Sequence, residues 1–166
     1  MPFIMRGVKR PRWYKEKVRP WLERDQVPAD SLTDLRTSQN SLSVYLIEDD
    51  KSNLDRVVTA LSVTRSKLQE YDYLLFDVGI LSQVNIKVRE SKGETPDSEV
   101  NEWHRHLVEI SGNQLLALVR QVLESNYETD RYLPGEISEF ATRAINSGQC
   151  ELSKVHPSIR KKLGFS

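Results

Sequence analysis

The feature that most constrains the fold is a dense apolar stretch that runs from Leu42 to Val88. Its first segment, LSVYLIE, is almost continuously apolar, as expected of a strand that is covered on both faces. A second segment with aromatic residues, YDYLLFD, begins at Tyr71 and has the same character. The segment Val84–Glu90 alternates apolar and polar residues, which is the pattern of a strand with one solvent-exposed face. This stretch therefore predicts three strands.

A helix is predicted between the first two of these strands. Ser52 is a good N-cap, and Asp55 stands at the third helical position, where a carboxylate completes a capping box. One helical face is apolar, because the spacing suits a period of 3.6 residues, and it consists of Leu54, Val57, Val58, Leu61 and Leu68. We expect a helix of about 18 residues, near 27 Å long.

The segment Glu102–Ile110 fits either a helix or a strand. Ser111 and Gln114 have the spacing of a capping box, which favours a strand that ends at Ile110 and a new helix over Asn113–Glu124. The leucines and valines of that helix predict that it is largely buried.

The remaining segments complete an α+β pattern. Ser125–Gly135 is polar and is expected to be a turn region, and Glu136–Ser147 is expected to be a last helix that Gly148 ends. We therefore predict an α+β fold, with a small mixed or antiparallel sheet of about four strands and three main helices packed on one face.

The N-terminal region differs from the rest in charge. Residues 1–24 carry a net charge of +6, although the whole chain is neutral. Three prolines in this region make a long helix unfavourable. We predict that residues 1–40 form a basic, aromatic arm with a short helix that Ser31 and Asp34 cap, and that residues 41–166 form a single α+β domain.

The basic arm is a candidate binding segment. Lysine and arginine neutralise phosphates while tryptophan and tyrosine stack on bases, so the mixture suits single-stranded nucleic acid. The same residues also suit an acidic protein partner, or docking of the arm on the body of the protein. The candidate nucleic-acid or partner-binding residues are Arg10, Arg12, Trp13, Tyr14, Lys15, Arg19 and Trp21.

A second candidate site is a metal centre. His104 and His106 share one face if their segment is a strand, and both rings then reach one metal ion or phosphate. A third ligand would come from elsewhere, for example Glu102 or Asp97. A separate acidic set at the strand ends would bind a divalent cation if the strands of Leu42 and Tyr71 are neighbours, and it consists of Glu48, Asp49, Asp50, Asp72 and Asp77. Our candidate metal ligands are His104, His106 and Asp77. A nuclease would use Asp77 with Lys87 on the next strand.

Composition narrows the function classes further. The single cysteine, Cys150, forms no disulfide framework, and no apolar run approaches the length of a membrane span or the core of a signal peptide. These features indicate a soluble, cytoplasmic protein, and no sequence motif indicates a cofactor. Our first hypothesis is a bacterial-type interaction protein that binds a partner protein, such as an antitoxin, an immunity protein or an accessory subunit. The alternatives are a nucleic-acid-binding module and a metal-dependent nuclease or hydrolase.

Overall fold

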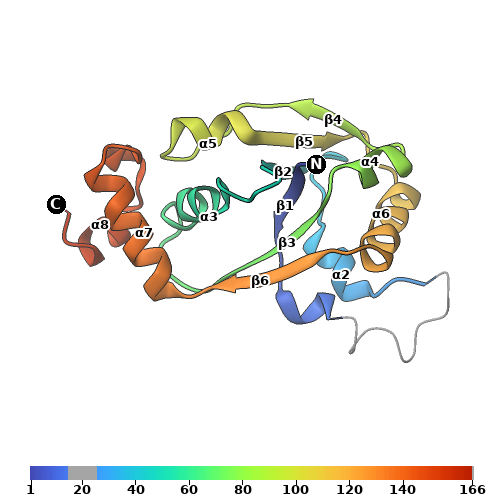
Figure 1. Ribbon diagram of the computed structural model, residues 1–166, viewed down its shortest axis with the longest axis horizontal. Helices are drawn as coiled ribbons and strands as arrows, with labels where there is room; N and C mark the ends of the chain where they lie inside the picture. Colours follow the sequence, from blue (N-terminus) through green and yellow to red (C-terminus); the bar gives the residue numbers. More distant parts are fainter. Residues whose placement is uncertain (15–25, 166) are drawn as a thin grey trace.

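The computed structural model describes residues 1–14 and 26–165 and confirms an α+β fold. All strands pair in an antiparallel manner in one six-stranded sheet, with the order β4-β5-β2-β1-β3-β6 (Figure 1). The predicted number of about four strands is therefore too low. The strands are β1 Phe3–Gly7, β2 Leu42–Ile47, β3 Tyr71–Asp77, β4 Lys87–Glu90, β5 His104–Val108 and β6 Glu128–Tyr132.

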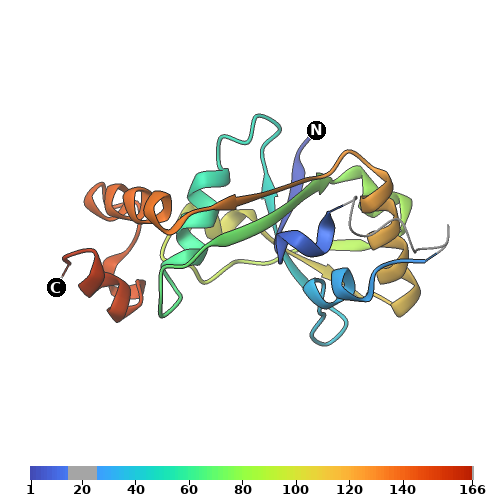
Figure 2. The same cartoon turned by 90° about the horizontal axis from the view of Figure 1, so that it is seen from below.

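Helices pack on both faces of this sheet, whereas the sequence predicted helices on one face. The two buried clusters follow the alternation of strand residues: Leu74 and Phe76 point into one cluster, and Tyr73 and Leu75 into the other. Figures 1 and 2 show α7 and α8 gathered at one end of the molecule and α6 at the other. The α-helices are α2 Ala29–Asp34, α3 Leu54–Ser62, α4 Gly79–Gln83, α5 Ser98–Trp103, α6 Gly112–Glu124, α7 Pro134–Asn146 and α8 Pro157–Lys162; η1 Arg10–Trp13 and η2 Leu152–Lys154 are 3-10 turns.

The beginning of the chain is a central strand rather than part of an arm. β1 lies between β2 and β3, and Ile4 and Met5 are fully buried on opposite faces of the sheet. Because the apolar run is short and basic residues follow it, the sequence pattern alone gave no reason to place it inside the sheet. Its burial depends on partners from distant segments.

The start of the predicted arm docks on the body through η1. The side chain of Trp13 is fully buried, and its indole N–H donates to the carboxylate of Asp34 at 3.0 Å. Ser31 is also buried, and its hydroxyl donates to the carbonyl of Arg12. The predicted cap at Ser31 is therefore wrong: Pro28 is the N-cap residue of α2, and Ser31 lies within the helix.

Three other elements differ from the predictions, two at the sheet edges and one at a helix end. β6 was expected to be a turn, because edge strands carry polar residues that hide the apolar pattern. β4 is shorter than the predicted Val84–Glu90 and is exposed at every residue. α3 has nine residues rather than about 18, and its N-cap is Asn53 instead of Ser52.

Both alternatives for Glu102–Ile110 are correct in part, since α5 ends at Trp103 and β5 begins at His104. The capping box of Ser111 and Gln114 is confirmed at the start of α6. No helix in the described ranges 1–14 and 26–165 is long and apolar enough to cross a membrane.

Candidate functional site: a cationic groove beside strand β1

A groove opens where β1 and β2 stop pairing. The two strands pair only between Phe3–Met5 and Tyr45–Ile47, whereas β1 stays paired with β3 as far as Gly7. Two cavities of about 540 and about 700 Å³ lie at this separation, and Arg6 and Ser43 line both of them. We call the two cavities together the cationic groove.

Arg6 reaches across the separation. Its Nη1 donates to the carbonyl of Ser43 at 2.8 Å, and its Nε lies 3.4 Å from the carbonyl of Asp34. Burial lowers the pKa of Arg6, while Tyr71 and Asp34 oppose this shift. Arginine nevertheless stays charged in proteins. The groove therefore contains a partly desolvated cation that an anion would stabilise.

The basic side chains that line the groove lack ion-pair partners among the residues that the structure describes. Within the described part of the chain, none of the five lining cations forms an ion pair with a carboxylate: Arg6, Lys9, Arg36, Arg65 and Arg89.

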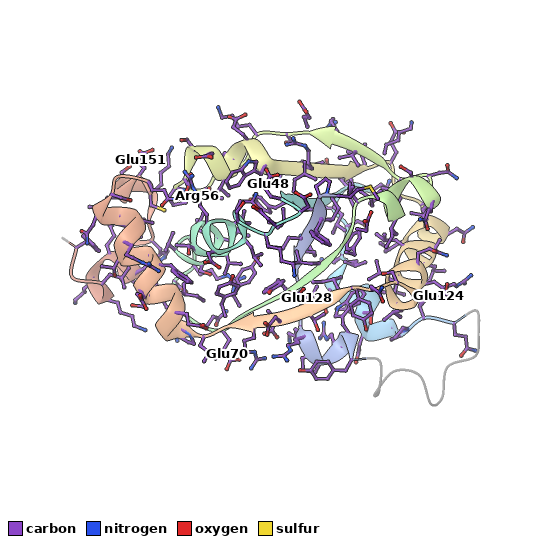
Figure 3. All side chains as sticks on the ribbon, in the orientation of Figure 1. Glu48, Arg56, Glu70, Glu124, Glu128 and Glu151 are labelled. Carbon is purple, nitrogen blue, oxygen red and sulfur yellow. The ribbon has the colours of Figure 1, made fainter. Side chains whose placement is uncertain are left out.

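The lining carboxylates are all paired with cations from outside the lining. Asp34 pairs with Arg12, and Glu109 pairs with Lys87. Asp72 and Glu70 both pair with Arg131, and Figure 3 labels Glu70 near the start of β3. Each acidic group of the groove is thus paired with a cation from outside it, whereas the basic groups form no ion pair among the described residues.

Asp34 and Asp72 are held in place by additional donors. The backbone N–H groups of Lys9 and Arg10 donate to Asp34 and Asp72, each at 3.0 Å. Burial would raise the pKa of Asp72, but its hydrogen bonds with Arg131 and Arg10 lower the pKa overall. The Asp72 carboxylate therefore stays ionised and engaged with Arg131.

Tyr71 adds a hydrogen-bond donor to the groove. Its side chain is buried, and the Arg65 guanidinium carbon lies 4.6 Å from the centre of its ring. Burial raises the pKa of Tyr71, so its hydroxyl keeps its proton. A Cβ atom at position 7 would lie only 2.8 Å from this oxygen, which explains the glycine at that position.

The two predicted histidines lie on the same face of β5. Their ring centroids are 4.8 Å apart. His104 contacts the hydroxyl of Ser43 through Nε2 at 2.5 Å, and its Nδ1 contacts the carbonyl of Ser91 at 2.9 Å. His106 lines the larger cavity, and its Nδ1 lies 3.0 Å from the hydroxyl of Ser41.

The proposed third metal ligand is not near these histidines. Asp77 lies on β3, which is separated from β5 by β2 and β1, and its carboxylate accepts the N–H of Gly79 at 2.6 Å. β3 and β4 are not neighbours either, so Asp77 and Lys87 do not form the expected pair. Residues 1–14 and 26–165 contain no cluster of three or more potential metal ligands.

The predicted arm residues have internal partners where the structure describes them. Arg12 and Trp13 both bind Asp34. The Arg10 guanidinium lies 3.7 Å from Asp130 and 5.6 Å from the centre of the Tyr14 ring. The other candidates lie outside the described residues: Lys15, Arg19 and Trp21.

Sequence reasoning missed the residues that form the groove. They are single basic or polar residues from distant segments, and none belongs to a recognisable motif. Only the short spacing of His104 and His106 gave a local signal of this region. Comparison with protein-family models, with curated proteins and with solved structures gave no match to the chain.

Proposed function

We propose that this protein binds single-stranded nucleic acid through the cationic groove. The observation that carries the proposal is the distribution of charge: the five lining cations have no carboxylate partner among the described residues, while the lining carboxylates are paired elsewhere. Phosphate groups neutralise such cations and release the counterions bound to them. Because the whole chain has a formal net charge of zero, the positive charge of the groove is a local feature and not a property of the chain as a whole.

The hollow shape of the groove favours a single strand over a duplex. Proteins that read duplex DNA insert a helix or a two-stranded ribbon into one of its grooves. Proteins that bind single strands instead hold the phosphate backbone in a positively charged groove of their own. The two cavities, of about 540 and about 700 Å³, have Arg6 and Ser43 in common, so they lie next to each other along the separation of β1 and β2.

Fluorescence anisotropy with a labelled single-stranded oligonucleotide tests the proposal over a series of salt concentrations. Arg36 and Arg89 are exposed and line the larger cavity, so Arg36→Gln and Arg89→Gln should leave the fold unchanged. Each variant should bind several-fold more weakly and reduce the salt dependence by about one phosphate contact.

Arg143→Gln is the matched control, because Arg143 is an exposed arginine on α7 that lines neither cavity of the groove. It should bind like the wild-type protein. Equal affinities of the wild type, Arg36→Gln and Arg89→Gln would contradict the proposal, as would an equal loss in the control.

We propose a partner protein as the second candidate, because β4 presents a free edge. Among the strands that the structure describes, β4 pairs with β5 alone, and all four of its residues are exposed. A strand from another protein can extend a sheet at such an edge. Val88→Lys should prevent strand addition through its charge. Co-purification from the native host should then recover the partner with the wild-type chain and lose it with the variant.

A further inference from the structure

We propose that Ser43 and His104 are a nucleophile and its general base, and that they hydrolyse phosphodiesters held in the cationic groove. The proposed substrate class rests on the proposed function, since it is the nucleic-acid backbone bound there. The observation behind it is a short contact, 2.5 Å, between the hydroxyl of Ser43, which lines both cavities, and Nε2 of the buried His104.

The hydrogen bonds of His104 determine which ring nitrogen carries the proton. Nδ1 lies 2.9 Å from the carbonyl oxygen of Ser91, which can only accept a hydrogen bond. Nδ1 must therefore donate, and Nε2 of the neutral ring is an acceptor. The Ser43 hydroxyl then donates to Nε2. This is the arrangement of a nucleophile, a base and a group that orients the base.

The surroundings of His104 keep the ring neutral and able to accept a proton. His104 is buried, with the ring of Tyr45 centred 5.1 Å away and that of His106 centred 4.8 Å away. Burial lowers the pKa of His104, the Ser91 carbonyl opposes this shift, and the charges of His106 and Arg105 add to it. A neutral imidazole is the form that a general base requires.

The position of Ser43 distinguishes this pair from a hydrogen bond that only stabilises a core. Ser43 lines both cavities and is partly exposed, so a bound phosphate can approach its hydroxyl. Arg6 donates to the carbonyl of the same residue, which places a guanidinium beside the nucleophile. Guanidinium groups stabilise the charge of a phosphoryl group during transfer.

The reaction has two balanced steps. Ser43 Oγ attacks the phosphorus and gives its proton to His104 Nε2; the bond to the leaving oxygen breaks, and that oxygen takes the proton from His104. Water then attacks the phosphorus of the seryl phosphodiester and passes a proton to His104; the bond to Ser43 Oγ breaks, and Oγ takes that proton from His104. The diester and one water become a phosphomonoester and an alcohol.

Hydrolysis of bis(p-nitrophenyl) phosphate and of a labelled single-stranded oligonucleotide by the full chain tests this inference. Ser43→Ala and His104→Gln should each lower the rate by about 100-fold or more, as expected when a base or its nucleophile is lost. Oligonucleotide binding by Ser43→Ala should stay within about twofold of the wild type, because no phosphate-binding cation is removed. Ser153→Ala is the control and should retain activity, because it removes a hydroxyl that contacts Glu151 and lines neither cavity of the groove.

The outcomes separate the two proposals. Cleavage that persists in Ser43→Ala overturns the inference, and so does a wild-type protein that binds the oligonucleotide without cleaving it, although the proposed function then stands. A wild-type protein that neither binds nor cleaves overturns both.

A second variant tests the pair without relying on turnover. In Ser43→Cys, His104 should increase the thiolate fraction of the new thiol, so iodoacetamide should alkylate it rapidly at neutral pH. Cys150 provides an internal reference, because burial raises the pKa of its thiol to about 11. Alkylation at position 43 that is no faster than at Cys150, or that His104→Gln does not slow, overturns the inference.

Discussion

Arg6 and Arg56 are two partly buried arginines with different partners. Arg56, on α3, holds both oxygens of Asp97 at 2.5 and 2.9 Å and also pairs with Glu99. Its guanidinium lies 5.7 Å from the centre of the Trp103 ring, and Figure 3 shows it between α3 and α5. Arg6, in contrast, donates to two backbone carbonyls and to no carboxylate among the described residues.

The difference indicates two uses of the same side chain. Asp97 is almost fully buried, and it also accepts the N–H groups of Glu99 and Val100 at the start of α5. Arg56 therefore compensates a charge inside the protein and joins two helices. Arg6 has five N–H donors and no carboxylate among the described residues, so much of its binding capacity remains for a ligand.

The largest expected effect is on stability when Arg56 is replaced. Arg56→Gln leaves the buried charge of Asp97 without its partner, so the free energy of unfolding should fall by about 3 kcal/mol. Urea unfolding followed by circular dichroism measures this loss. The affinity of the folded protein for an oligonucleotide should not change.

Arg143→Gln is again the control, since an exposed substitution changes stability by about 0.5 kcal/mol or less. If Arg56→Gln is no less stable than this control, the two arginines do not differ in the way that their contacts indicate.

The next largest expected effect is a loss of stability when Gly7, which lines the groove, is replaced by alanine. In Gly7→Ala the new methyl group meets the Tyr71 hydroxyl oxygen at 2.8 Å, so the protein should lose about 2 kcal/mol of stability through overpacking. Tyr71→Phe in the same chain removes this oxygen and leaves the ring carbon at 3.3 Å as the nearest atom.

The double variant should therefore recover part of the loss. A thermodynamic cycle of the two single variants and the double variant measures the interaction. Additive changes would show that Tyr71 does not limit the space at Gly7.

Arg6→Gln should give the opposite result to Arg56→Gln. Because Arg6 forms no ion pair with a carboxylate among the described residues, we expect the free energy of unfolding to change by less than about 1 kcal/mol. Oligonucleotide affinity should fall about tenfold, which corresponds to about 1.4 kcal/mol. A parallel measurement of unfolding and anisotropy on both variants shows whether stability and binding separate. If Arg6→Gln destabilises the protein as strongly as Arg56→Gln, Arg6 is structural.

The parts of the fold that were predictable depend on local sequence. Ser111 and Gln114 cap α6 through residues three positions apart, and the apolar runs of β2 and β3 need no distant information. β1 and β6 are short or polar, so their place in the sheet depends on β3, with which both of them pair.

The candidate site was less predictable for the same reason. The spacing of His104 and His106 predicts that they share a face only once the strand is known. Ser43, the partner of His104, comes from a different strand, and the pairing of β2 with β5 brings the two together. The cations of the groove come from distant segments of the chain, and only the tertiary structure brings them together. No local sequence pattern predicts this.

The smallest expected effect concerns His104, which resembles Arg6 in having no carboxylate partner among the described residues but can release its proton. Because the folded state holds the pKa of His104 below its ordinary value of 6.5, the unfolded chain binds more protons as the pH falls below that value. This contribution to stability is fully present above about pH 6.5 and is lost as the pH falls through the folded pKa, with a slope of at most about 1.4 kcal/mol per pH unit for one proton. Urea unfolding between about pH 7.5 and about pH 5.5 should show the loss, and His104→Gln should reduce it. A bound oligonucleotide should also reduce it, because nearby phosphates favour protonated His104; a slope unchanged by both would contradict the role of this buried ring.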